Sequence, residues 1–460
     1  MISPSPYLRK TDNSSVQAQP AIEQFADRVN CQALQEIVSK ESGFLRRIIW
    51  LAFFLGGLIL MGFQIYERSI FYSSRPVRVN TYTVIPRSVK FPAVTLCNYN
   101  AISKFTARNM GQLEAFERYF PLSLGDQNFD GLNNSRFEWD SVLNNTETFL
   151  QKCIWRGTKC SMDNFSRIYT DMGVCYSFNH EVRDKKRLES DSSGSLFGLQ
   201  LTLDVQQADY FRGFAGKGAG FKVMVHDPRE PPLITDMGFS VGAGMHTLVG
   251  LKMINISNLD TSQWGKCNRD IKLKHHVVYS QSACRLECLY EYMEKKCQCV
   301  RFLKFKNHQG PRARLCDPEQ LFNCYTPNYN LFIQEKGQCS HTCPVACESI
   351  KYEVSLSQAP VADYHAYNSA TTTNETKVNK YRKNFVQLDI FFREISYERR
   401  EQYQAYNAFT LGCDIGGALG LILGASVLTL FEVGDFIILM VLKGKWRRQT
   451  QVTSVSVHKK

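Results

Sequence analysis

The chain has 460 residues, a formal net charge of +12 and a mean hydropathy of −0.27. This length is too great for one small core and fits two or three packed units, while the mean hydropathy excludes a protein that lies mostly within a membrane. The excess of basic residues does not indicate nucleic-acid binding, because Lys and Arg do not cluster with aromatic residues into a recognisable module.

The first strongly apolar stretch runs from Ile48 to Tyr66. It carries no charge, and at about 1.5 Å per residue it spans roughly 28 Å, which is enough to cross a bilayer. The stretch starts too deep in the chain, and is too long, to be the apolar part of a cleaved signal peptide. We predict a transmembrane helix at residues 46–67, preceded by a cytosolic arm at residues 1–45.

The middle of the chain is rich in cysteine and in N-glycosylation sequons. Of the 16 Cys, 14 lie between the two apolar stretches, and an even, dense set of this kind predicts disulfides in an oxidising compartment. The two remaining cysteines are Cys31, in the arm, and Cys413, at the start of the second apolar stretch. The sequons, which support an extracellular location, are at Asn133, Asn144, Asn164, Asn255 and Asn374.

Several stretches of this middle part have the pattern of β-strands. The predicted strands are residues 89–100, 173–179, 196–205 and 384–397. Cys284 and Cys288 are spaced i, i+4, so they lie on one face of a predicted helix that disulfides attach to the second Cys-rich run at residues 339–347. We therefore predict an α+β membrane protein with a β-rich, disulfide-stapled extracellular domain at residues 68–406.

The second apolar stretch extends from about Phe409 to Leu442 and predicts a second transmembrane helix at residues 407–443. Arg46 and Arg47 precede the first span. The basic residues that follow the second span are Lys443, Lys445, Arg447 and Arg448. Because positive residues mark the cytoplasmic side, both termini are predicted to be cytosolic, and residues 444–460 form the C-terminal tail.

The second span carries acids, which are costly in a bilayer. Projected as a helix, one stripe holds Asp414, Gly417, Leu421, Gly424, Leu428, Glu432 and Asp435. A charge at mid-bilayer costs at least about 2.5–3.5 kcal/mol, so such acids are tolerated where they face water or protein. Glu432 and Asp435 could instead extend to the cytosolic interface, but this alternative does not explain Asp414 on the same face.

One helix cannot enclose a pore, so several copies must assemble around the stripe. Rings of carboxylates would then concentrate cations at both mouths. The small residues Gly424, Ala425 and Ser426 would let the helices approach closely and expose backbone carbonyls to water. We predict that these three residues form a selectivity filter.

Two other classes of site are disfavoured. Cys297, Cys299, Cys316 and Cys324 offer four thiols for zinc, but extracellular thiols oxidise and no His spacing matches a zinc finger. The sequence contains no nucleophile elbow, zincin or phosphate-loop pattern. We therefore expect no metal site, no cofactor and no enzymatic activity.

Five stretches occur in an order that resembles the degenerin/epithelial sodium channel family, and most closely its acid-sensing and peptide-gated branch, which includes FMRFamide-gated invertebrate channels. They are FPAVTLCN (91–98), GVCYSFN (173–179), YSQSACRLECLYEYMEKKCQC (279–299), LDIFF (388–392) and DIGGALGLILGAS (414–426). The resemblance extends from about residue 25 to residue 445. It implies a trimer whose subunits are shaped like a clenched hand, with a thumb at about residues 267–350.

The resemblance also implies function and disulfide pairing. Sodium would be the main permeant ion, and amiloride would block the pore. Whether calcium also permeates is left open. Trp264 matches an aromatic residue that couples the thumb to the first membrane helix, although a plain core Trp is an equal alternative. The implied pairs are Cys97–Cys175, Cys153–Cys160, Cys267–Cys347, Cys284–Cys343, Cys288–Cys339, Cys297–Cys324 and Cys299–Cys316.

Departures from the family pattern concern gating. Acid-sensing members carry two His after the first span and two Asp in the thumb. The matching positions here are Pro76 and Val77, and Thr326 and Asn330. Since these side chains cannot bind a proton near neutral pH, a secreted peptide is the preferred agonist over protons.

Two further positions bear on opening. A His-Gly pair in the family's cytosolic arm corresponds to Gln32 and Ala33, and Ala lacks the backbone freedom of Gly. The subunit is therefore expected to conduct weakly alone and to need related subunits in a heterotrimer. Cys413 occupies the position where a bulky residue holds such channels open.

Together these features predict a subunit of a trimeric, amiloride-sensitive, peptide-gated sodium channel, embedded in plasma-membrane lipid. A proton-gated or constitutively open sodium channel is the alternative within the class. A non-conducting receptor or regulatory subunit is the alternative from another class.

Overall fold

The computed structural model describes most of residues 43–442. The described residues are 37, 43–114, 117, 143, 147–180, 187–211, 218–276, 278–301, 315–334, 339–362, 379, 382–424, 426, 428–429 and 431–442. Several predicted features lie outside the described residues, namely Cys31, Gln32, Ala33, Asn133, Asn144, Asn374, Ala425 and the basic residues after position 442.

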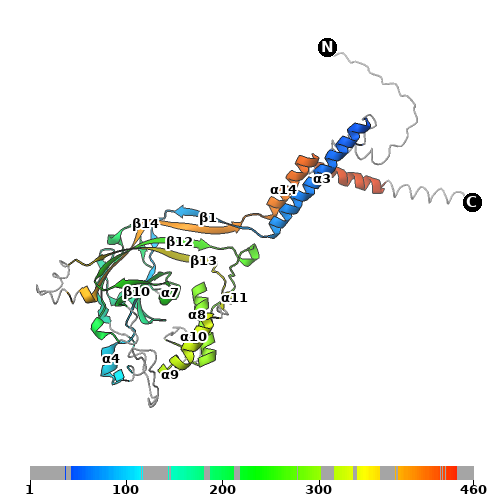
Figure 1. Ribbon diagram of the computed structural model, residues 1–460. Coiled ribbons are helices and arrows are strands. Elements are labelled where there is room, and N and C mark those ends of the chain that lie inside the picture. The colour runs from blue at the N-terminus through cyan, green and yellow to red at the C-terminus, as the bar shows by residue number, and fades with distance from the viewer. Residues whose placement is uncertain are drawn as a thin grey trace, which may run out of the picture. The chain divides into compact units, whose positions relative to one another are not determined.

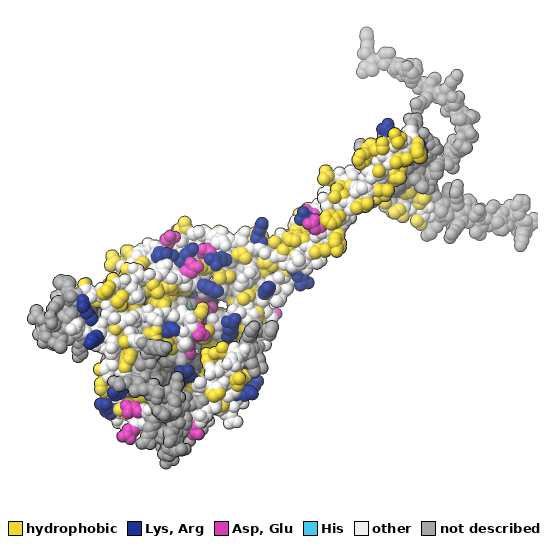
Figure 2. All heavy atoms as spheres, viewed as in Figure 1, with side chains coloured by type: hydrophobic (Ala, Val, Ile, Leu, Met, Phe, Trp, Pro, Cys, Tyr) yellow, Lys and Arg dark blue, Asp and Glu magenta, His cyan; other side chains and the backbone are white. Residues whose placement is uncertain are grey.

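The chain divides into two compact units. The helical unit comprises Met1–Val77 and Gln404–Lys460, and the larger unit is Arg78–Tyr403. In the helical unit, α3 (Phe44–Ser73) and α14 (Ala408–Leu423) pack side by side (Figure 1). The face of these helices seen in Figure 2 is largely hydrophobic, whereas most of the visible charged side chains lie on the larger unit. This distribution fits a helix pair that is surrounded by lipid.

Among the described residues, α3 is the one helix long and apolar enough to cross a membrane. It has 30 residues, buries none of them, and extends past the predicted end at residue 67. The second predicted span is not one continuous helix. Its first part, α14, is an apolar helix of 16 residues that ends at Leu423, and residues 431–442 are helical again. The projection of one uninterrupted stripe therefore fails at Gly424.

The larger unit is built on three sheets. The first has seven strands in the order β13-β12-β14-β9-β4-β5, with β1 paired to β14; the second has the order β11-β10-β3-β7-β6; and the third pairs β2 with β8. Most neighbours are antiparallel, but β12 and β14 are parallel. The strand bounds are β1 Val77–Val84, β2 Val89–Lys90, β3 Ala93–Asn98, β4 Leu150–Trp155, β5 Thr158–Lys159, β6 Phe165–Thr170, β7 Gly173–Phe178, β8 Glu189–Ser190, β9 Leu199–Asp204, β10 Gly220–His226, β11 Phe239–Gly242, β12 Met245–Ser257, β13 Glu348–Pro360 and β14 Phe385–Gln404.

Short helices surround these sheets. The α-helices are α4 Lys104–Asn109, α7 Ile234–Met237, α8 Gln281–Cys297, α9 Pro318–Gln320, α10 Thr326–Gln334 and α11 Cys339–Thr342. The 3-10 helices are η1 Glu147–Phe149, η2 Met162–Asn164, η3 Ser195–Phe197, η4 Gln207–Asp209 and η5 Thr261–Gln263, and η6 Leu321–Tyr325 is a π-helix.

The four predicted strands are present, and their sequence patterns explain their burial. β9 alternates buried and half-buried residues, and β14 continues to residue 404, beyond the predicted end at residue 397. Val386, Leu388, Ile390 and Phe392 are each at most 2 % exposed, which confirms that they share the core face of β14. The predicted strand at residues 89–100 is divided into β2 and β3 around Pro92, because proline cannot donate a ladder hydrogen bond.

Seven disulfides staple the larger unit, and they confirm the implied pairing. The bonded pairs are Cys97–Cys175, Cys153–Cys160, Cys267–Cys347, Cys284–Cys343, Cys288–Cys339, Cys297–Cys324 and Cys299–Cys316. Cys284 and Cys288 share one face of α8 and bond to the second Cys-rich run, as their spacing predicts. Five of the seven disulfides fall in the Cys-rich lobe at residues 267–347, where they close loops that lack a large core of their own.

A buried carboxylate fixes the segment that leads into α8. Glu287, 6 % exposed, accepts hydrogen bonds from the backbone N–H groups of Lys274, His275 and His276, and its Oε1 lies 2.9 Å from Nδ1 of His276. Burial would raise the pKa of Glu287, but these hydrogen bonds outweigh it and hold the pKa below the usual value. The adjacent His pair therefore has a structural role in this lobe.

Candidate functional site

The second apolar segment begins at a defined cap. The side chain of Asn407 accepts hydrogen bonds from the backbone N–H of Thr410, at 2.8 Å, and from the Thr410 hydroxyl, at 2.9 Å. Such a cap satisfies a backbone donor of the first turn and sets where α14 starts. α14 then continues for four turns of mostly small and aliphatic residues before it stops.

The stop is a glycine in the left-handed region. Gly424 has φ +66° and ψ 13°, and its N–H donates to the carbonyl of Gly420 at 3.1 Å. This geometry is a helix C-cap that glycine adopts without steric cost. The sequence predicted a break at Gly424, Ala425 and Ser426, and a break that starts at Gly424 is confirmed.

The chain is reorganised directly after the break. Ser426 N–H donates to the hydroxyl of Thr429 at 3.1 Å, and Thr429 N–H donates to the carbonyl of Ser426 at 3.0 Å. This reciprocal pair starts the next helical piece. Thr429 was not singled out from the sequence, although a hydroxyl residue three positions after Ser426 is a recognisable capping signal.

α3 approaches α14 closely just before the break. A Cβ at Gly57 of α3 would lie 2.8 Å from Cγ2 of Ile422. A side chain at position 57 would force Ile422 or a helix to shift, so glycine favours this close approach, as small residues do in membrane helix packing. The Gly56-Gly57 pair in the first apolar stretch was the available sequence signal for this contact.

The predicted pore-lining residues have different environments. Gly417, Leu421, Leu428 and Asp435 are exposed in the single chain, Leu421 to 88 % and Leu428 to 70 %. Glu432 is half-buried, and its Oε2 has no hydrogen-bond partner among the described residues. A single helix pair leaves lipid-facing and pore-facing residues equally uncovered, so the pore-lining assignment stays a prediction.

Asp414, the outer acid of the predicted stripe, is not isolated. Its Oδ2 accepts a hydrogen bond from the hydroxyl of Tyr406 at 2.6 Å and lies 3.7 Å from Nε of Arg68. The Tyr406 ring packs edge-on against Phe71, with centroids 5.2 Å apart, and against Tyr72 at 6.5 Å. We call Arg68, Tyr406 and Asp414 the outer clamp. Burial and the hydrogen bond to Asp414 raise the pKa of Tyr406, which therefore stays protonated and donates.

Sequence reasoning missed Arg68 and Tyr406. Arg68 belongs to α3 and Tyr406 precedes α14, and no local pattern links positions so far apart in the chain. Cys413, next to Asp414, is exposed and is not in a disulfide, so its thiol is available to reagents at this end of α14.

Residues 25–436 match the family described as amiloride-sensitive sodium channels. The chain belongs to this family. It is 31% identical over 443 residues to acid-sensing ion channel 1C of Danio rerio, covering 90% of this chain and 82% of that protein. It is 30% identical over 458 residues to acid-sensing ion channel 1 of Gallus gallus, with 93% and 86% covered. It is 29% identical over 435 residues to the bile acid-sensitive ion channel of Mus musculus, with 87% and 84% covered.

The amiloride-sensitive sodium channel family consists of ion channels and not of enzymes. Its members are plasma-membrane proteins with two spans and a large, disulfide-rich extracellular domain, which matches the helical unit and the larger unit of this chain. The chain is therefore a subunit of a cation channel of this family. The observed break at Gly424 lies inside the matched region.

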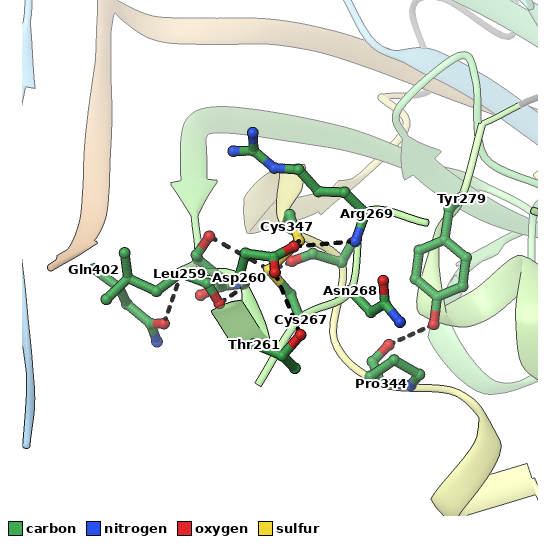
Figure 3. Close-up of a disulfide and its surroundings, with 12 residues drawn as sticks. Leu259, Asp260, Thr261, Cys267, Asn268, Arg269, Tyr279, Pro344, Cys347 and Gln402 are labelled. Carbon is green, nitrogen blue, oxygen red and sulfur yellow. Dashed lines mark hydrogen bonds between the residues drawn. A yellow bond between two sulfur atoms is a disulfide. The ribbon is translucent and has the colours of Figure 1, made fainter. Parts of the chain in front are cut away.

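Trp264, predicted to couple gating, lies in a tightly held loop of the larger unit. Figure 3 shows Asp260 at the centre of this loop, beside the Cys267–Cys347 disulfide. Asp260 accepts hydrogen bonds from the backbone N–H groups of Ser262, at 2.9 Å, and Arg269, at 3.2 Å. Trp264 itself has φ 72°, an uncommon conformation for a bulky residue. Its coupling role stays a prediction.

The same loop could be mistaken for a metal site. Asp260, Cys267 and Cys347 bring potential ligand atoms within 4.8 Å of one another. The two sulfur atoms are joined in a disulfide, however, and a metal would need thiolates. The carboxylate of Asp260 is used instead to hold the turn.

The positions that lack proton-binding side chains have ordinary structural roles. Thr326 donates its hydroxyl hydrogen bond to the carbonyl of Leu321 at 2.8 Å, and Asn330 is exposed on α10. Close to these positions, Tyr325 at the end of η6 stacks on Tyr329 of α10, with centroids 6.1 Å apart. Burial raises the pKa of Tyr325 to about 12, so this pair does not titrate near neutral pH.

The carboxyl of Glu230, in the larger unit, has a pKa near neutrality. Burial and the neighbouring Asp227 carboxylate raise the pKa of Glu230 to about 7. Asp227 is itself buried and paired to Arg229, whose Nε lies 3.0 Å from Oδ1. Sequence reasoning did not single out Glu230, because the burial that contributes most to its raised pKa is not visible in the local sequence.

Proposed function

We propose that this chain is a subunit of a trimeric, amiloride-sensitive sodium channel of the plasma membrane that opens when an extracellular peptide binds. Both termini would then lie in the cytosol, and the larger unit outside. The observation that carries the proposal is the break at Gly424, which interrupts an apolar helix between two acidic ends in a chain of this family.

The helical unit supports conduction. A pair of helices cannot surround a water-filled path, so several copies must assemble, and three copies would place three breaks around one axis. The backbone of the break at Gly424 would then face water, where its carbonyls would replace part of the hydration shell of an ion. Glu432 and Asp435 would draw sodium to the inner mouth, and calcium would be drawn by the same charges.

Four positions support a peptide agonist, two at the end of the helical unit and two in the larger unit. The four positions where acid-sensing relatives are expected to bind protons hold Pro76, Val77, Thr326 and Asn330, which do not titrate. The preferred assembly is a heterotrimer with related subunits, because the N-terminal arm carries Gln32 and Ala33 in place of a His-Gly pair.

Proton gating remains the second candidate, and Glu230 is the observation that favours it. A carboxyl with a pKa of about 7 takes up a proton when the outside is acidified, which would remove its repulsion with Asp227. An acid response of the chain should then have its midpoint near that value and should disappear in Glu230→Gln.

The agonist is tested by voltage clamp on cells that express the chain with a related subunit. We expect a sodium current, blocked by amiloride, when a peptide fraction from nervous tissue is applied at neutral pH, and no such current after protease digestion of that fraction. Steps to about pH 5 should give less than a tenth of that current. A larger acid response that Glu230→Gln abolishes would contradict peptide gating and establish the proton alternative.

A further inference from the structure

The outer clamp brings two different groups to one oxygen atom of Asp414. Oδ2 accepts the Tyr406 hydroxyl at 2.6 Å, a short hydrogen bond to a charged acceptor, whereas Nε of Arg68 is 3.7 Å away, beyond hydrogen-bond distance. The carboxylate and the guanidinium are 39% and 52% exposed. Water therefore weakens the ion pair, and the hydroxyl fixes the position of the carboxylate.

Tyr406 is itself held firmly. The residue is 5 % exposed, and its ring packs edge-on against Phe71 and Tyr72 of α3. The backbone beside it is also tied to the end of the first span, since Ala405 N–H donates to the carbonyl of Pro76 at 2.9 Å. A hydroxyl on a fixed ring keeps one direction, so it can select one orientation of a partly exposed carboxylate.

We propose that Tyr406 is a positioning residue that turns the carboxylate of Asp414 toward Arg68 and thereby sets the negative charge at the outer mouth of the pore. With the clamp closed, the carboxylate of Asp414 lies against α3, and Arg68 partly balances its negative charge. With the clamp open, the carboxylate is free to face the water above the pore and to attract cations. This inference rests on the proposed function, because only a pore gives this charge a mouth to control.

Cys413 provides a reporter that needs no current. Its thiol is exposed and adjacent to Asp414 in the chain. A cationic thiol reagent reacts faster near a negative charge and an anionic reagent more slowly, so the ratio of the two rates measures the local potential. Labelling of surface protein reports this ratio whether or not the subunit conducts.

The experiment uses the full chain at the cell surface. The cells are treated for increasing times with a cationic reagent, trimethylammonium-ethyl methanethiosulfonate, or with an anionic one, sulfonato-ethyl methanethiosulfonate. The thiol that remains at Cys413 is then labelled with an impermeant biotin-maleimide. Arg68→Gln removes the balancing charge, and Tyr406→Phe removes only the hydroxyl. The matched control is Tyr403→Phe, which loses a hydrogen bond of 2.8 Å from its hydroxyl to Asn80 but does not touch Asp414. Cys413→Ser gives the background.

The cation-to-anion rate ratio should rise about three- to tenfold in Arg68→Gln and at least about twofold in Tyr406→Phe, and it should stay at the wild-type value in Tyr403→Phe. A wild-type ratio in Tyr406→Phe would overturn the positioning role, even if Arg68→Gln changes the ratio. Failure of Cys413 to react in every variant would also overturn the proposal, because the outer end of α14 would then not face water. Normal labelling without sodium current would leave the clamp intact and count against the proposed function alone.

Discussion

Replacing Gly424 with Ala should reduce the preference of the channel for sodium over potassium by about tenfold. Gly424 has φ +66°, and a Cβ there would meet no atom within 4 Å, so the cost of the substitution comes from the backbone and not from crowding. An L-residue pays about 1–2 kcal/mol for this conformation, so the backbone of the break is expected to rearrange. The strain is relieved if α14 continues through residue 424, which moves the carbonyls of the break.

The selectivity change is measured as the shift in reversal potential of the amiloride-sensitive current when external sodium is replaced by potassium. Gly416→Ala is the matched control. Gly416 lies in the same helix, has open space around its Cα, and does not have a positive φ. A wild-type sodium preference in Gly424→Ala, or an equal loss in both variants, would contradict the assignment of the break as the filter.

Replacing Gly265 with Ala should prevent normal folding of the loop that carries Trp264. A Cβ at Gly265 would lie 1.5 Å from the carbonyl oxygen of Leu259 and 2.1 Å from its carbon, and backbone atoms cannot yield as a flexible side chain can. The loop would have to open, which would break the hydrogen bond of 2.8 Å from Gly265 N–H to the carbonyl of Asp260. We expect the free energy of unfolding to fall by about 3 kcal/mol or more.

Thermal unfolding of the detergent-purified protein and the fraction that reaches the cell surface both report this loss. Gly218→Ala is the control, because a Cβ at Gly218 meets nothing within 4 Å and the residue does not have a positive φ. If Gly265→Ala unfolds at the same temperature as Gly218→Ala, the close packing of this loop against Leu259 is wrong.

Much of the fold was predictable because its signals are local. The alternation in β9 and the apolar face of β14 follow from the period of two that a strand imposes, and Pro92 marks the division between β2 and β3. The spacing of Cys284 and Cys288 predicted one bonded helix face. The full pairing of 14 cysteines could not be derived from spacing and came from the family resemblance.

The site was predictable only in part, for the same reason. The break at Gly424 could be predicted from the residue type, since the conformational freedom of glycine does not depend on its neighbours. The outer clamp joins α3 to the start of α14 across more than 300 positions of chain, and the raised pKa of Glu230 depends first on its burial in the fold. Neither leaves a pattern in neighbouring residues. The prediction of one continuous pore-lining stripe was wrong, because it assumed an uninterrupted helix and the positive φ of Gly424 ends α14.

The measurement that tests the central claim most directly is a recording from cells expressing this chain, alone and with a related subunit, before and after the cationic thiol reagent is applied outside. We predict a sodium-selective, amiloride-sensitive current that the reagent increases through Cys413, and no such increase in Cys413→Ala. With the protein present at the surface, the absence of any amiloride-sensitive current under both conditions would contradict the account and indicate a subunit that does not form a pore.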